Sequence, residues 1–127
     1  MKPFILKASS RSPDISLKPE QNKLLISGES YPENVTAFYA QLEKPLQAYF
    51  ESSPDKLEVE IALRYFNSGS AHALLNILRT LDKHAQKGCV IYLNWQVFID
   101  DDIGREFAQD IAEQAPNLFL SIGEITE

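Results

Sequence analysis

The segment from residue 57 to residue 87 constrains the fold of this chain more than any other. From Leu57 to Tyr65 apolar and polar side chains alternate, which is the period of a strand with one buried face. From Ala71 onward apolar residues recur at helical spacing, and the helix is expected to end near Lys87 and Gly88. Strands of a sheet covered on both faces read as continuous apolar runs instead. The alternation therefore predicts a sheet with helices on one face and a largely solvated second face.

The remaining segments extend this strand–helix alternation over the whole chain. We expect a hairpin (15–17 and 24–26), a helix from Val35 to Phe50 interrupted at Pro45, a strand (89–95), a helix (103–115) and a last strand (118–122). The order β-β-α-β-α-β-α-β indicates an α/β fold. Crossover connections are right-handed and join parallel strands, so the sheet should be mostly parallel, with only the first strand antiparallel and three helices on one face. Residues 1–127 are expected to form a single domain.

Composition excludes several classes of function. The chain has 127 residues and a formal net charge of −6, without a Lys/Arg stripe, which disfavours nucleic acid and anionic membranes as partners. A single cysteine, Cys89, excludes an internal disulfide. No apolar run approaches the roughly 20 residues of a membrane span, and the N-terminal segment is too short for a signal peptide. The cytoplasm is the expected compartment.

The junction between the strand at 57–65 and the following helix is the candidate functional site. Asn67, Ser68, Gly69 and Ser70 lie where helix N–H groups and the helix dipole favour negative charge. Such a serine can carry a phosphate, or it can simply cap the helix, as serine commonly does. Two further loops, 30–34 and 96–102, should lie at the same carboxyl edge of the sheet, where open α/β sheets place functional groups.

The residues around this junction resemble a known family. Gly28-Glu29-Ser30-Tyr31-Pro32-Glu33-Asn34, together with Leu63-Arg64-Tyr65-Phe66-Asn67-Ser68-Gly69-Ser70, is similar to the SiaC family of bacterial regulatory phosphoproteins. The order of elements resembles the wider group of STAS domains, the fold of anti-sigma-factor antagonists. The similarity extends from the hairpin to Trp95. Two departures stand out: serine replaces the family's threonine at the acceptor position, and Asn67 replaces the aspartate of the wider STAS pattern.

The resemblance implies a non-enzymatic switch. Its implied partners are a protein kinase, a metal-dependent protein phosphatase and a diguanylate cyclase, which makes cyclic di-GMP in control of biofilm formation and aggregation. The implied phosphorylation site is Ser68. The expected partner-binding residues are Tyr31, Pro32, Glu33, Asn34, Asn67, Ser68, Gly69 and Ser70. An anti-sigma-factor antagonist of the partner-switching type is the alternative within the same class.

Other chemistry is less well supported by the residues. Ser68 and His72 are four positions apart and would suit a small hydrolase, but no G-x-S-x-G motif surrounds the serine. Asp100, Asp101 and Asp102 lack the order of a calcium loop and are better explained by the start of a helix, where they would also oppose a phosphate on Ser68. The glycines form no phosphate loop or dinucleotide motif, so no cofactor is expected.

Overall fold

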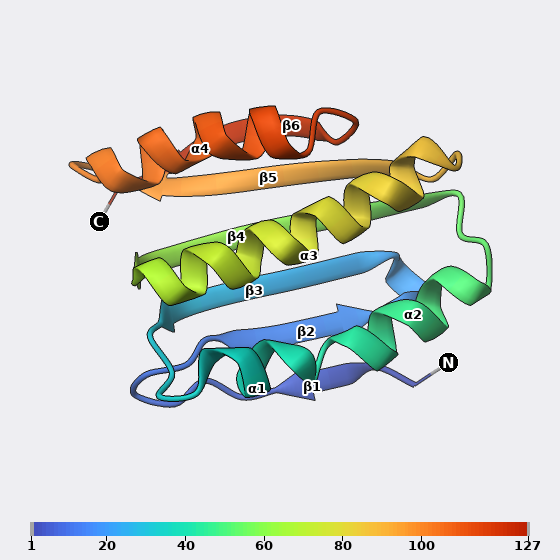
Figure 1. The fold of residues 1–127 in the computed structure, drawn as a ribbon, viewed down its shortest axis with the longest axis horizontal. Coiled ribbons are helices and arrows are strands. Elements are labelled where there is room, and N and C mark those ends of the chain that lie inside the picture. The colour runs from blue at the N-terminus through green and yellow to red at the C-terminus, as the bar shows by residue number, and fades with distance from the viewer. Residues whose placement is uncertain (1, 127) are drawn as a thin grey trace.

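The protein is built on one six-stranded mixed sheet (Figure 1). The computed structural model describes residues 2–126. The strands lie side by side in chain order: β1 (Phe4–Leu6), β2 (Asp14–Lys18), β3 (Lys23–Ser30), β4 (Lys56–Phe66), β5 (Val90–Phe98) and β6 (Phe119–Ile125). β2 is antiparallel to both of its neighbours, whereas β3, β4, β5 and β6 are mutually parallel.

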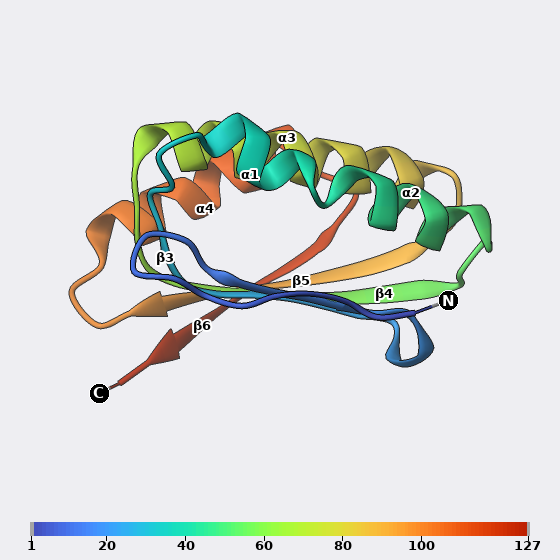
Figure 2. The same ribbon diagram turned by 90° about the horizontal axis from the view of Figure 1, so that it is seen from below.

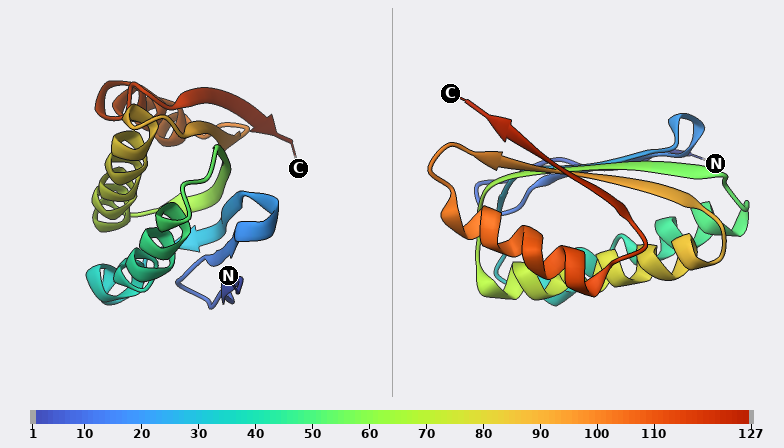
Figure 3. Two further views of the ribbon diagram at one scale, coloured as in Figure 1. Left: turned by 90° about the vertical axis from the view of Figure 1, so that its right-hand side faces the viewer. Right: turned by 90° about the horizontal axis from the view of Figure 1, so that it is seen from above.

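All of the α-helices lie on one face of this sheet (Figures 2 and 3). They are α1 (Val35–Ala40), α2 (Glu43–Glu51), α3 (Ser68–Gln86) and α4 (Asp102–Gln114), and a short 3-10 helix, η1 (Pro19–Gln21), joins β2 to β3. Each crossover adds the next strand on the same side of the last, and right-handed connections then return every helix to the same face. The predicted α/β class, with helices on one face, is confirmed.

Two elements differ from those that the sequence predicts. β1 was not predicted, because three residues are too short for a periodic pattern, yet it pairs with β2 through Phe4, Ile5 and Leu6. The predicted helix from Val35 to Phe50 is divided into α1 and α2. The break precedes Pro45, which lies in the first turn of α2, where its missing N–H costs no helical hydrogen bond.

The core lies between the sheet and the helices. Leu57, Val59, Ile61 and Leu63 of β4 are at most 2% exposed, as the alternation predicts. They meet the apolar face of α3, whose buried residues include Leu74, Leu78 and Leu81. Trp95 on β5 is 1% exposed, and its indole N–H donates to the Gly104 carbonyl of α4 at 2.9 Å. In residues 2–126 no helix is both long and apolar enough to cross a membrane.

A β-bulge near the end of β4 changes which side chains face the core. Gly28 is opposite Leu63 and Glu29 is opposite Tyr65, so Arg64 is an extra residue on β4. A bulge shifts the alternation by one residue. Tyr65, expected on the buried face with Leu63, is therefore 52% exposed. Phe66 turns inward instead, and its ring lies 5.8 Å from Trp95 and 5.2 Å from Phe107.

One buried carboxylate joins α3 to the turn that precedes β6. Asp82 on α3 is 5% exposed and accepts hydrogen bonds from the Asn117 backbone N–H at 2.7 Å, the Asn117 side chain at 3.1 Å and Gln86 at 2.9 Å. Burial raises the pKa of this carboxyl group, but these hydrogen bonds outweigh burial and hold the pKa below its ordinary value. The ionised form of Asp82 thus stabilises the fold.

Replacing Asp82 with asparagine is expected to lower the free energy of unfolding by about 2 kcal/mol at pH 7, because hydrogen bonds to a charged acceptor are lost. A lowered pKa in the folded state gives stability that is present above the unfolded-state pKa and lost as the pH falls through the folded one. The difference between wild type and variant should therefore shrink below about pH 4. Urea titrations of wild type and variant, at pH 7 and again below about pH 4, measure this difference in the free energy of unfolding. Asp110→Asn, at an exposed position of α4, is the control and should change stability by less than about 0.5 kcal/mol.

Candidate functional site

Four loops meet at the carboxyl edge of the parallel strands. Residues 31–34, 67 and 99–101 follow β3, β4 and β5, and residues 7–13 join β1 to β2 at the same edge because β2 runs the opposite way. The Asn67 backbone N–H donates to the Ser30 carbonyl at 3.2 Å, which ties the first two loops together. The predicted meeting of loops 30–34, 67–70 and 96–102 at one edge is confirmed.

Asn67, rather than a serine, caps the N-terminus of α3. Its side-chain oxygen accepts the Ser70 backbone N–H at 2.9 Å, and its backbone is extended, as a capping residue requires. Ser68 is the first residue of the helix and its side chain is exposed. The interpretation of Ser68 or Ser70 as the cap is therefore wrong. The Asn67 side chain already accepts the Ser70 N–H, which is the hydrogen bond that defines the cap. The Ser68 hydroxyl is left at the surface, beside the positive end of the helix dipole.

Replacing Asn67 with alanine is expected to lower the free energy of unfolding by about 1 kcal/mol, the usual value of a side-chain cap. Asn67→Ser should preserve most of that stability, because serine caps about as well as asparagine. Thermal unfolding of the three proteins compares them directly. Equal stability of the alanine and serine variants would contradict the capping role.

Beneath Ser68 lies a buried chain of hydroxyl groups. The Ser30 hydroxyl lies 2.6 Å from the Tyr39 hydroxyl and donates to the Ser70 hydroxyl at 2.7 Å, linking β3, α1 and α3. Ser30 and Ser70 are fully buried, and Tyr39 is 4% exposed. Burial raises the pKa of Tyr39 to about 12, against a smaller lowering by the hydrogen bond with Ser30, so the phenol is neutral at physiological pH. Ser70 was expected to bind a partner, but its buried side chain supports the junction from inside.

A partly buried tyrosine and an exposed tyrosine form an aromatic pair at this edge. Tyr31 and Tyr65 make an edge-to-face contact with ring centroids 5.6 Å apart. The Tyr31 hydroxyl donates to the Ser10 carbonyl at 2.9 Å, and its backbone N–H donates to the Arg11 carbonyl at 2.7 Å. The loop of residues 7–13 and Tyr65 thus belong to this surface, although sequence reasoning missed both. Recognising β1 would have placed that loop here.

The remaining predicted residues of the surface divide by role. Asn34 caps α1, since its side chain accepts the Ala37 N–H at 3.1 Å. Glu33 is exposed and Pro32 is partly buried. A side chain at Gly69 would meet Val35 at 3.3 Å, so the glycine lets α1 and α3 approach closely. Of these side chains, Glu33 is the one most able to reach a partner.

Two of the three aspartates after β5 form the start of a helix, whereas Asp100 lies in the preceding turn with a φ of 68°. Asp101 caps α4 by accepting the Gly104 N–H at 2.8 Å, which confirms the capping interpretation. Asp102 lies in the first turn, where an acidic residue complements the helix dipole. In the part of the chain that the structure describes, no group of three or more His, Cys, Asp or Glu residues could hold a metal ion.

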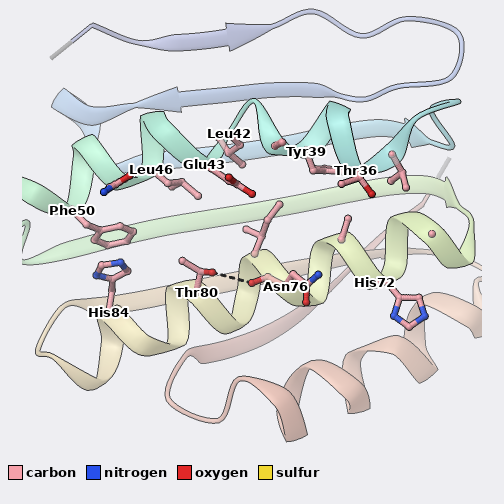
Figure 4. A pocket seen from close by; sticks show the side chains of 16 residues that line it. Thr36, Tyr39, Leu42, Glu43, Leu46, Phe50, His72, Asn76, Thr80 and His84 are labelled. Carbon is pink, nitrogen blue, oxygen red and sulfur yellow. Dashed lines mark hydrogen bonds between the residues drawn. The ribbon is translucent and has the colours of Figure 1, made fainter.

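A groove on the helical face opens beside the junction. It has a volume of about 580 Å³ and runs between α1–α2 and α3 from Gly69 to His84 (Figure 4). Apolar side chains, including Tyr39, Leu46 and Ile77, line much of it. At its far end the rings of Phe50 and His84 stack 3.8 Å apart. Burial, with a smaller contribution from Lys87, lowers the pKa of His84, so this ring is neutral at pH 7.

Comparison with known proteins gives the family. Residues 6–125 match the family model described as SiaC family regulatory phosphoprotein. The chain belongs to the SiaC family. An uncharacterized protein of Pseudomonas aeruginosa (strain UCBPP-PA14) is 27% identical over 94 residues, which cover 74% of this chain and 75% of that protein.

Solved structures of SiaC from Pseudomonas aeruginosa share the fold. The crystal structure of apo-SiaC has a TM-score of 0.87 at 24% identity, covering 97% of this chain and 99% of that one. SiaC in a crystal structure of the diguanylate cyclase SiaD in complex with its activator SiaC has a TM-score of 0.87 at 23% identity, covering 96% and 99%. These likenesses show that the SiaC fold extends over almost the entire chain.

The geometry of this SiaC-family chain does not assemble the hydrolase considered above. Within residues 2–126 no hydrogen bond joins Ser68 to His72, although both side chains are exposed. A nucleophile needs a base within hydrogen-bonding distance. In the described residues, the Ser68–His72 contact that such a site would use is not formed.

Proposed function

We propose that the protein is a non-enzymatic regulator that binds a diguanylate cyclase and is switched by phosphorylation of Ser68. The observation that carries this proposal is the position of Ser68: it is the exposed first residue of α3, whose cap is supplied by Asn67. A kinase can reach this hydroxyl without breaking a hydrogen bond of the fold. The family match and the SiaC–SiaD complex support a cyclase as the partner.

The proposed partner surface is the carboxyl edge around Ser68. Its exposed or partly exposed members are Tyr31, Pro32, Glu33, Asn34, Asn67, Ser68 and Gly69, with Tyr65 added by the bulge. The aromatic pair Tyr31–Tyr65 supplies rigid apolar area at little cost in side-chain entropy. The adjoining groove starts at Gly69, so a partner that covers Ser68 can also bury apolar side chains there.

The phosphate would act through its charge rather than by changing the fold. It adds about −1.5 to −2 charges at pH 7. At the first turn of α3 the helix dipole favours this charge, so the free protein tolerates it. A partner that packs over Ser68 would have to desolvate the phosphate, and burying an uncompensated charge is costly. The unphosphorylated form is therefore the form that binds.

A dedicated kinase and a metal-dependent phosphatase complete the proposed switch. Incubating the protein with its kinase and ATP should add a single phosphate, seen as one mass increment, and peptide mapping should place it on Ser68. Ser68→Ala should remain unmodified, whereas Ser70→Ala, which removes only a buried hydroxyl, should still be modified if it folds. Phosphorylation of another residue in wild type would contradict the assignment of Ser68.

A further inference from the structure

The face of the sheet opposite the helices carries no helix (Figure 3), and several apolar side chains are exposed on it. Ile5, Leu25, Tyr92 and Phe119 are 50%, 36%, 48% and 60% exposed. The rings of Tyr92 and Phe119 lie 5.6 Å apart and form one aromatic surface. A hollow of about 740 Å³ on this face extends from Lys23 to Phe119 across the middle of the sheet. Ser68 lies at the edge of the sheet, so this surface is separate from the proposed switch.

The strand register arranges charged and aromatic side chains in one row across this face. Lys18 pairs with Lys23, Lys23 with Glu58, Glu58 with Tyr92, and Tyr92 with Phe119. The row therefore has two cations at one end, a carboxylate near its middle and two aromatic rings at the other end. If a second copy of the row is laid against the first in the opposite order, the ammonium groups of one copy face the carboxylate or the aromatic rings of the other.

The charge balance of the face differs from that of the whole chain. Toward the amino ends of β3 and β4 this face carries three ammonium groups (Lys18, Lys23, Lys56) and two carboxylates (Glu58, Glu60), whereas the chain has a net charge of −6. A strongly basic partner would be drawn to other surfaces, because this one is not acidic. Adjacent opposite charges, such as Lys23 and Glu58, can pair with their counterparts in a second copy related by two-fold symmetry.

We propose that this face binds a second copy of the chain, sheet against sheet, about a two-fold axis parallel to the strands between β3 and β4. That axis reverses the row, so Lys23 of each copy faces Glu58 of the other. Lys18 then faces the Tyr92 ring, a favourable cation–π arrangement. Both contacts occur twice by symmetry, and Leu25 and Phe119 fill the space around them.

The size of the face sets the expected strength of the dimer. Six strands about 4.8 Å apart, over about seven residues of about 3.3 Å each, give an area near 600 Å² per copy. The total of about 1,200 Å² is at the lower limit for stable protein interfaces. Interfaces of this size include weak, transient ones, so we expect a dimer that forms as the protein concentration rises.

Charge reversal gives a test that depends on the proposed pairing. In Lys23→Glu a glutamate would face Glu58 twice, and in Glu58→Lys a lysine would face Lys23 twice. Sedimentation velocity of the full chain, from about 1 to about 100 μM, should show a monomer–dimer equilibrium for wild type and monomers for each variant. An equimolar mixture of the two variants should dimerise again, because every pair then joins opposite charges. Ile103→Lys, at a 67% exposed position on α4 outside this face, should dimerise like wild type.

The other outcomes would overturn the proposal. Wild type that stays monomeric over this range would show that the face does not bind a second copy. Variants that dimerise like wild type would place the interface elsewhere. Two monomeric variants whose mixture stays monomeric would rule out the Lys23–Glu58 pairing. Circular dichroism of each variant confirms that these surface substitutions leave the fold intact.

Discussion

Ser68→Asp is expected to weaken binding of the cyclase by about 30-fold or more, because a partner covering Ser68 must bury an unpaired carboxylate at a cost of about 2 kcal/mol or more. The same substitution should not destabilise the free protein. An acidic side chain in the first turn of α3 interacts favourably with the helix dipole, so the free energy of unfolding should stay equal or rise by up to about 1 kcal/mol. Calorimetric titration with the cyclase measures the first effect, and urea unfolding measures the second.

The control for this variant adds the same charge elsewhere. Gln21 is exposed in η1, between β2 and β3 at the opposite edge of the sheet. Gln21→Glu should therefore leave the affinity within about two-fold of wild type, because exposed charges far from an interface are screened by salt. Equal weakening by both variants would show that overall charge, rather than the position of Ser68, governs binding.

Ser70→Asp should have the opposite pattern, with a large loss of stability. The Ser70 side chain is fully buried and accepts the Ser30 hydroxyl, whose other neighbour is the Tyr39 hydroxyl. A carboxylate there would be larger than the hydroxyl and would have no cation to pair with. Burying such a charge should lower the free energy of unfolding by about 3–5 kcal/mol. Thermal and urea unfolding measure this loss.

The two serines are expected to differ in role. The exposed Ser68 hydroxyl is the proposed phosphorylation site, whereas the buried Ser70 hydroxyl supports the fold. Ser70→Ala removes the hydroxyl without adding charge and should cost only about 1–2 kcal/mol, the value of one buried hydrogen bond. If Ser70→Asp were as stable as Ser68→Asp, the hydroxyl chain through Ser30 and Tyr39 would not be buried as described.

Sequence reasoning found the architecture because hydrophobic periodicity reports directly which face is buried. The alternation in β4 gave the one-sided sheet, and the apolar spacing after Ala71 gave α3. It missed β1, whose three residues have no readable period, and it placed Tyr65 on the wrong face. A bulge depends on the register between β3 and β4, which is a property of two strands and cannot be read from either alone.

The sequence predicted which loops meet at the carboxyl edge of the sheet, but not the roles of the individual side chains there. Serines and asparagines all favour helix starts, so composition could not show that Asn67 caps α3 while Ser68 stays exposed and Ser70 is buried. The contact between Ser30 and Ser70 joins residues 40 positions apart, and only the folded structure brings them together. The family resemblance supplied the choice of Ser68, and the exposure of its side chain is what makes that choice physically reasonable.

The central claim is that a phosphate on Ser68 controls binding of the cyclase. The most direct measurement is a titration of the cyclase with one preparation of this protein in two forms, phosphorylated by its kinase and then dephosphorylated by the phosphatase. We predict that the phosphorylated form shows no measurable binding and that removal of the phosphate restores it. Equal dissociation constants for the two forms would contradict the account.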